Sequence, residues 1–173
     1  MLYVALLHSI LLPKGRLVMA DLRDLAAGLG LSEPRTVAAT GNLVFEGGDV
    51  AASELEQKLE AAYAERFGRA LDIIVRDAAS FRRTVAANPF PDADSALVMA
   101  RLQRAPLPPE TAQALEKHRP PEDELRIVGG DVWVKFAAPP SSSRLLSALT
   151  TQRLGVGTSR ILNTLRKLDE MLG

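Results

Sequence analysis

Basic side chains at three places in the sequence have the chemistry to bind an anion. Lys14 and Arg16 stand on either side of a glycine in a predicted loop. Arg144 follows a run of serines just inside a predicted helix, and Arg160 follows a Thr-Ser pair at the predicted start of the last helix. A helix start favours an anion because its first N–H groups have no partner, and an arginine adds a charged fork of donors. We predict a cationic site for an anionic small molecule or a nucleic-acid phosphate. The alternative is that these cations form surface ion pairs or lay their stems on apolar surface.

Asn42 is a further candidate for this site because it stands in a predicted turn. The segment Thr40-Gly41-Asn42-Leu43-Val44-Phe45 links two predicted strands, residues 35–40 and 42–46. Gly and Asn tolerate the positive φ that tight hairpins need. One interpretation is a purely structural turn, and the other places the Asn42 amide at a loop tip beside a ligand. Because side chains alternate along a strand, Leu43 and Phe45 are expected on one face and Val44 on the other.

Patterns for catalysis and metal binding are weak in this sequence. The chain has no cysteine and two histidines, His8 and His118, which do not stand at a metal-ligand spacing. We find no phosphate-binding glycine loop and expect no cofactor and no metal. His8 ends the first predicted strand and is the near-neutral base that an enzyme would use. Trp133 is expected in the core or at an interface rather than stacked on a nucleic-acid base.

The composition is that of an ordinary folded protein of 173 residues, with 47% hydrophobic and 24% charged residues. A formal net charge of zero does not attract the chain to nucleic acid or to an anionic membrane. No stretch reaches the roughly 20 apolar residues of a membrane helix, and the first residues do not read as a signal peptide. We expect a cytoplasmic protein with no membrane partner.

The first half of the chain predicts the element order β-α-β-β-α-β. Apolar runs and helical spacing give strands at residues 2–9, 35–40, 42–46 and 71–75 and helices at residues 18–29 and 54–67. Ser53 and Glu56 match a capping box at the start of the second helix. This order is that of the ferredoxin-like split βαβ arrangement, with two helices on one face of an antiparallel sheet. We assign residues 1–75 to a ferredoxin-like α+β subdomain.

Residues 76–173 predict a second α+β subdomain with a similar strand order, and we expect the two subdomains to pack as one unit. A helix is predicted at residues 77–87 before the elements of this half, which run β-α-β-β-α-α. They are strands at residues 96–103, 124–128 and 132–136, a helix at 110–118, a helix containing Leu145, Leu146 and Leu149, and a last helix that Thr158 or Ser159 caps.

Several short motifs together resemble a known family. They are Tyr3-Val4-Ala5-Leu6-Leu7, Met19-x-x-Leu22, Thr40-Gly41-Asn42-Leu43-Val44-Phe45, Asn88-Pro89-Phe90-Pro91, Ser143-Arg144-Leu145, Leu154-Gly155 and Ser159-Arg160. As an ordered set that spans nearly the whole chain, they are similar to the bacterial family of domain of unknown function 1697 (DUF1697). The resemblance implies an α+β protein with ferredoxin-like halves, and it brings no established activity.

The chain departs from the family pattern in two regions. After the first strand the family tends to have Arg-Gly-Ile-Asn and a glycine pair, whereas this chain has His8-Ser9-Ile10-Leu11 and a single Gly15. Near the C-terminus it keeps the arginine at Arg160 and loses the Asn-Trp pair that follows it in the family. These losses indicate a diverged member whose ligand site differs from that of its relatives.

Three functions follow as hypotheses. The first is a small binding or regulatory module that holds an anionic ligand at its basic residues, namely Lys14, Arg16, Arg144 and Arg160 with Asn42. The second is a protein–protein interaction module or homodimer without a small ligand, because sheet edges and an open sheet face can pair with a second chain. The third is an enzyme that acts on a phosphorylated or carboxylated small substrate.

Overall fold

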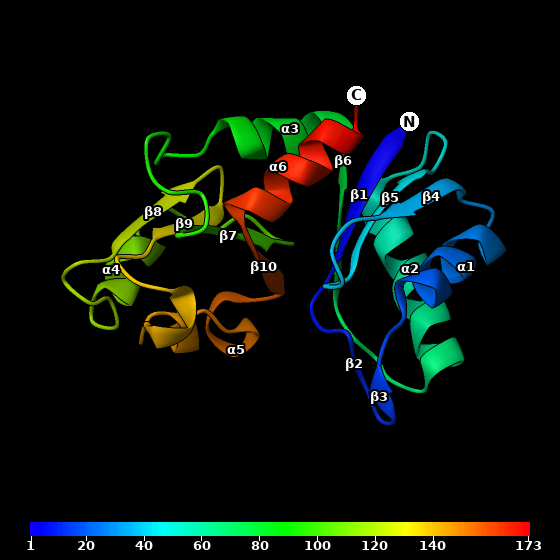
Figure 1. Cartoon of the computed structure of the whole chain (residues 1–173), viewed down its shortest axis with the longest axis horizontal. Coiled ribbons are helices and arrows are strands. Elements are labelled where there is room, and N and C mark those ends of the chain that lie inside the picture. The colour runs from blue at the N-terminus through cyan, green and yellow to red at the C-terminus, as the bar shows by residue number, and fades with distance from the viewer. The chain divides into compact units, whose positions relative to one another are not determined.

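Two four-stranded antiparallel sheets and one two-stranded hairpin make up the β-structure of the chain (Figure 1). The computed structural model describes residues 1–173 and contains six α-helices between and after the strands. The predicted α+β class is therefore confirmed. No helix is long and apolar enough to cross a lipid bilayer.

The chain divides into two compact units. The first unit consists of residues 1–82 together with residues 167–173, and the second unit consists of residues 83–166. The two changes of unit fall within the helices α3 (Ala78–Ala86) and α6 (Leu162–Met171). The division into subdomains after residue 75 remains a prediction.

The sheet of the first unit has the strand order β4-β5-β1-β6. Its strands are β1 (Leu2–Leu7), β4 (Ser32–Thr36), β5 (Asn42–Glu46) and β6 (Ile73–Asp77). The first strand in sequence is thus central, between the third and the fourth. All neighbouring strands are antiparallel, and Tyr3 of β1 lies opposite Phe45 of β5.

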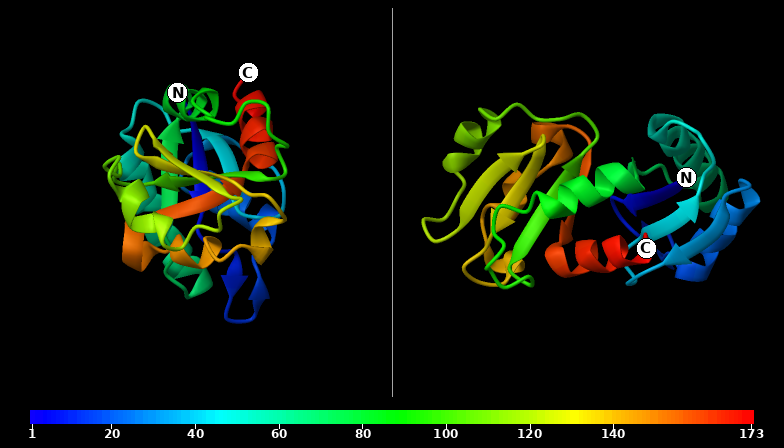
Figure 2. Two further views of the ribbon diagram at one scale, coloured as in Figure 1. Left: turned by 90° about the vertical axis from the view of Figure 1, so that its left-hand side faces the viewer. Right: turned by 90° about the horizontal axis from the view of Figure 1, so that it is seen from above.

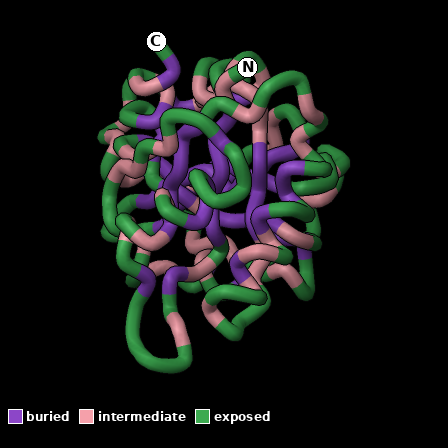
Figure 3. Tube along the Cα trace, turned by 90° about the vertical axis from the view of Figure 1, so that its right-hand side faces the viewer, coloured by how far each residue is buried: buried purple, intermediate pink, exposed green.

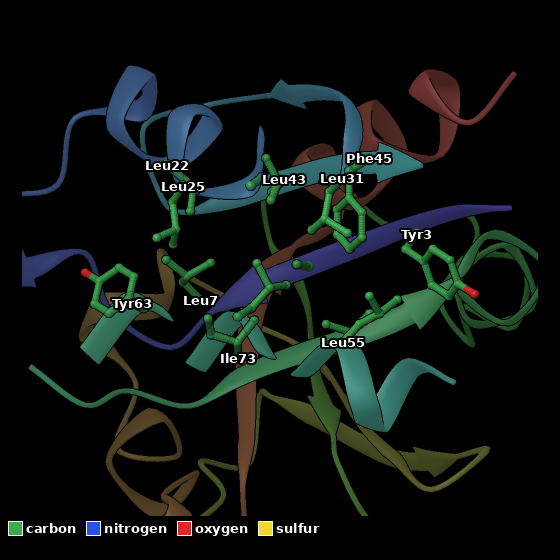
Figure 4. Packing of buried hydrophobic residues seen from close by; sticks show 14 of the residues in the cluster. Tyr3, Leu7, Leu22, Leu25, Leu31, Leu43, Phe45, Leu55, Tyr63 and Ile73 are labelled. Atoms are coloured by element: carbon green, nitrogen blue, oxygen red, sulfur yellow. The ribbon is translucent and has the colours of Figure 1, made fainter. Parts of the chain in front are cut away.

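Two helices, α1 (Met19–Gly28) and α2 (Ala52–Phe67), cover one face of this sheet (Figure 2, right). Every second residue of the strands points to this face, as the predicted alternation of Leu43, Val44 and Phe45 requires. Figure 4 shows the resulting core, in which helix residues meet strand residues: Leu22 and Leu25 from α1, Leu55 and Tyr63 from α2, and Tyr3, Leu7, Leu43, Phe45 and Ile73 from the sheet.

The predicted capping box at the start of α2 is not formed. The helix begins two residues earlier than expected, at Ala52, with Ala51 as N-cap and no side-chain cap. The carboxylate of Glu56 instead accepts a hydrogen bond from the backbone N–H of Val75 at 2.9 Å, and Glu60 accepts one from Ile73 at 2.9 Å. These two carboxylates, one helical turn apart, satisfy N–H groups on the outer edge of β6.

The opposite edge of the first sheet is also protected against pairing. In β4, Pro34 has no N–H to donate, and the register with β5 shifts between Ser32 and Arg35. Glu33 within this irregular stretch has a positive φ of 52°. Edge-to-edge pairing through the first sheet is therefore opposed on both sides.

A short hairpin, here called the arm, follows β1. It consists of β2 (Leu11–Leu12) and β3 (Gly15–Arg16), a pairing that the sequence analysis read only as a loop. The arm extends away from the sheet (Figures 1 and 2). Its residues are exposed except Leu12, which is half-buried against the core, and the flanking Ile10 and Leu17 are buried. Figure 3 shows the burial along the chain trace.

The sheet of the second unit has the strand order β10-β7-β9-β8. Its strands are β7 (Val98–Gln103), β8 (Glu124–Val128), β9 (Asp131–Lys135) and β10 (Gly157–Ile161). As in the first unit, the first strand in sequence lies between the third and the fourth. The glycine pair between β8 and β9 has positive φ at both residues, so the predicted second hairpin is confirmed.

Strand β10 corrects the sequence analysis, which placed residues 158–161 in the last helix. Gly157 lies opposite Gln103 of β7, and a Cβ at Gly157 would come within 2.8 Å of the carbonyl oxygen of Leu102. The helix α6 begins only at Leu162. The local Thr-Ser pattern is that of a helix cap, but pairing with a strand more than 50 residues earlier decides the conformation.

One face of the second sheet is covered by short elements. These are α4 (Thr111–Glu116), α5 (Thr151–Leu154) and two 3₁₀ turns, Pro140–Ser142 and Leu146–Ala148, which replace the predicted helix around Leu145. Their apolar residues pack with Met99, Val132 and Val134 of the sheet.

Candidate functional site

The predicted site residues of the first unit lie on the arm and on β5. Lys14 and Arg16 are exposed on the arm, Lys14 in its turn and Arg16 on β3. The guanidinium of Arg69 donates to the backbone carbonyl of Leu11 and so ties the arm to the end of α2. The arm thus carries two cations on a projecting element.

Asn42 is fully buried, and its amide is used by the fold. Its Nδ2 donates to the carbonyl oxygen of Val37 at 2.9 Å and to the hydroxyl of Thr40 at 2.7 Å. The preceding Gly41 has a φ of 78°, and its carbonyl accepts the N–H of Leu7. The contacts of Asn42 are therefore those of a structural turn, and they close the loop between β4 and β5.

His8 lines a hollow of about 360 Å³ at the same end of the first sheet. Its backbone N–H donates to the carbonyl oxygen of Asp72, which joins the end of β1 to the residues before β6. Glu60 and Arg69 also line this hollow, so carboxylates and a guanidinium lie around the imidazole. A reaction at His8 stays a prediction.

In the second unit, Arg160 is not at a helix start. It lies on β10 opposite Ala100, is 8% exposed, and donates to the Thr158 hydroxyl at 2.9 Å and to the Ser159 carbonyl at 2.8 Å. Burial lowers the pKa of Arg160 to about 10, so the side chain is still cationic at neutral pH.

Arg160 and Arg144 lie on opposite sides of the second sheet. Arg160 shares its face with Ala100, while Met99 points to the other face. Leu145, the neighbour of Arg144, packs with Met99 on that other face. The second unit therefore does not combine the two arginines in one anion site. Trp133 lies opposite Ala100 and is fully buried, so it is a core residue as predicted.

Arg144 is exposed in a turn that a buried carboxylate holds in place. Asp123, which is 4% exposed, accepts the Ser143 hydroxyl at 2.6 Å and the Ala137 N–H at 2.9 Å. The Ser143 oxygen in turn accepts the N–H of Leu145 at 3.2 Å. These bonds fix the backbone on both sides of Arg144.

Arg153 lies on α5, which is anchored to the second sheet. Buried Arg101 of β7 donates to the carbonyl of Gly155 at 3.0 Å, and the amide of Gln103 donates to the carbonyl of Leu154 at 2.6 Å. Thr150 caps the helix by accepting the N–H of Arg153 at 3.3 Å. The exposed guanidinium of Arg153 thus projects from a fixed backbone.

Four side chains with positive or titratable groups gather here, and we call them the Arg144 cluster: Lys117, His118, Arg144 and Arg153. His118 follows α4 and is half-buried, and its Nε2 contacts Nη1 of Arg153. Partial burial lowers the pKa of His118 below its ordinary value of 6.5. The positive charges of Arg153, Lys117 and Arg144 lower it further.

The sequence analysis found only one member of this cluster, Arg144. Lys117 and His118 lie about 30 residues before it. Arg153 lies on α5, which the local pattern did not distinguish from the predicted helix before it. The only available signal was the coincidence of basic residues near predicted helix ends. Their proximity depends on how α4 and α5 pack on the second sheet.

Comparison with known proteins gives a family and a fold. Residues 1–133 match the sequence model of a family described as "Protein of unknown function (DUF1697)". The chain also resembles a solved structure described as that of the conserved bacterial protein SP0830 from Streptococcus pneumoniae, with a TM-score of 0.76 and 21% sequence identity. That likeness covers 99% of this chain and 98% of the other, and at this identity it shows a common fold. None of the curated proteins matches the sequence.

Proposed function

Because this chain belongs to the DUF1697 family, whose function is unknown, we propose a function from its own residues: it is a small binding module that holds an anion at the Arg144 cluster. The observation that carries the proposal is the convergence of Lys117, Arg144 and Arg153 around His118. Positive charges held close together repel one another, and an anion between them removes that repulsion.

The surroundings of the cluster support this function. Arg119, the neighbouring cation, forms an ion pair with Glu116 at 2.7 Å. None of the three cations of the cluster forms such a pair with a carboxylate. Guanidinium groups bind phosphate and carboxylate oxygens through two parallel donors, so Arg144 and Arg153 suit a phosphate or carboxylate ligand.

We expect Arg144→Gln and Arg153→Gln each to weaken the binding of inorganic phosphate by about tenfold, since a hydrogen bond to a charged group contributes about 1.5–3 kcal/mol. Isothermal titration calorimetry at low ionic strength measures this loss. Lys58→Gln is the matched control, because it makes the same charge change in the first unit, where Lys58 pairs with Glu54.

Titration with a mononucleotide and with a short single-stranded oligonucleotide then distinguishes a small phosphorylated ligand from a nucleic-acid backbone. Binding of none of these probes at low salt contradicts the proposed function. So does binding that both arginine variants leave unchanged.

A second candidate function is protein–protein contact through the arm, including formation of a homodimer. Leu11 on the arm and Val18 just after it are 55% and 59% exposed, and they are two of the five large apolar residues that are exposed in this protein. Lys14 and Arg16 lie between them. Because the edges of the first sheet are blocked, the arm is the projecting element that a second chain can reach.

If the arm joins two copies, light scattering over a dilution series gives a mass that falls from dimer to monomer. The double variant Leu11→Ser, Val18→Ser is then expected to be monomeric at every concentration. A strict monomer of the unmodified protein at all concentrations removes the homodimer from this second function.

We also infer that both units are ferredoxin-like. The inference is supported by the strand order of the two sheets, in which the first strand lies between the third and the fourth in each case. It is further supported by the element order β-α-β-β-α-β of each unit, apart from the arm in the first.

A further inference from the structure

The contact between His118 and Arg153 favours one protonation state of the imidazole. A guanidinium carries only N–H donors and has no accepting lone pair. In the contact of Arg153 Nη1 with His118 Nε2, the arginine therefore donates and Nε2 accepts. An accepting Nε2 has no proton, so this contact favours the neutral imidazole with its ring proton on Nδ1.

All the charges that act on His118 have the same sign. Arg153 comes from α5, Lys117 precedes His118 in the chain, and Arg144 comes from the turn held by Asp123. Glu116, the acidic residue that ends α4, is paired with Arg119. Protonation of His118 thus adds a fourth positive charge to a cluster that has no carboxylate partner.

We propose that the Arg144 cluster binds a doubly charged oxyanion, such as the terminal phosphate of a phosphomonoester, and that His118 takes up a proton when it binds. This inference rests on the proposed function. A dianion cancels the repulsion that keeps the imidazole neutral, and it offers oxygen acceptors to both side chains. Nε2 gains a proton from solvent and donates to one anion oxygen, while the Arg153 guanidinium donates to another. One proton is taken up for each anion bound at a pH between the free and bound pKa of His118.

The sign of the pH dependence follows from this coupling. The pKa of His118 lies below 6.5 in the free protein and rises when the anion is bound. Below the free pKa the imidazole is already protonated, so affinity is highest there. As the pH rises from the free pKa to the bound pKa, affinity falls, and above the bound pKa it is constant at its lowest value.

Sulfate is the probe that tests this directly, because it stays doubly charged between pH 5 and 8, whereas a phosphomonoester titrates at a pKa of about 6. The protein has two histidines, so a proton NMR titration follows two imidazole rings. The signals that are absent from the spectrum of His118→Gln belong to His118. We expect saturating sulfate to raise the pKa of His118 by about one unit. The signals of His8, in the first unit, are the control, and at fixed pH sulfate is expected to leave them in place.

The same coupling predicts that sulfate affinity falls about tenfold from pH 5 to pH 8, because one pKa unit corresponds to a factor of ten. In His118→Gln this fall is lost and sulfate binds at every pH with the low affinity of the alkaline limit. Sulfate binding with an unchanged His118 pKa and a flat pH profile overturns the proton coupling and leaves the proposed function standing. Absence of binding, at acidic as well as alkaline pH, overturns the proposed function itself.

Discussion

Replacing Phe45 by alanine lowers the free energy of unfolding by about 3–5 kcal/mol. Phe45 is fully buried in the core of the first unit, between the sheet and its two helices. Its ring stacks on that of Tyr3, with centroids 5.7 Å apart and planes inclined by 19°. Truncation removes this contact and the apolar burial of the ring, and it leaves a cavity that the surrounding strands cannot close.

Urea denaturation followed by far-UV circular dichroism measures this loss. Glu46→Ala is the control, since Glu46 is the next residue on β5 but is exposed, and its replacement is expected to change the free energy of unfolding by less than about 0.5 kcal/mol. A Phe45→Ala variant as stable as Glu46→Ala means that the core around β1 and β5 is not packed as described.

Replacing Gly41 by valine costs about 2–5 kcal/mol of stability, for two separate reasons. The φ of 78° at Gly41 is strained for any β-branched residue. A Cβ at this position also lies 2.8 Å from Leu7 Cβ and 2.9 Å from Ile10 Cγ2, which is closer than carbon atoms approach one another. The valine must therefore push β1 and the base of the arm away from the turn.

Gly48→Val separates the two effects in the same denaturation experiment. Gly48 has a similar φ of 69°, but a Cβ there meets no heavy atom within 4 Å. Its replacement shows the backbone strain alone, and the remaining loss in Gly41→Val is steric. Equal losses in the two variants contradict the close approach of the turn to Leu7 and Ile10.

The proposed anion site and these core residues have different physical origins. The burial of Phe45 follows from strand alternation, and the positive φ at Gly41 follows from the turn. Both leave strong local signals in the sequence. The Arg144 cluster depends on exposed cations that belong to three separate segments, and each of them alone looks like an ordinary surface charge. This is why the sequence analysis placed the hairpin of β4 and β5 near its true position and named only Arg144 among the four members of the cluster.

Polar residues show the same contrast within the first unit. The pattern of Ser53 and Glu56 is that of a capping box, and nothing nearby in sequence argues against it. The packing of α2 on the sheet brings Glu56 to the N–H of Val75, and a charged acceptor for a buried strand edge outweighs a helix cap in water. A partner 19 residues away therefore determined what this side chain does.

The sequence by itself determined the α+β class, the hairpins β4–β5 and β8–β9, the positive φ at Gly41 and the burial of Phe45 and Trp133. These features depend on alternation, turn residues and apolar content, which act over a few neighbouring residues. Only the tertiary structure decided that residues 157–161 form a strand, that Arg160 is buried on one sheet face, and that Arg153 contacts His118 while the charge of Arg144 also acts on it. The physical reason is that these contacts join segments distant in sequence, whose pairing is set by the packing of the whole second sheet and not by local preference.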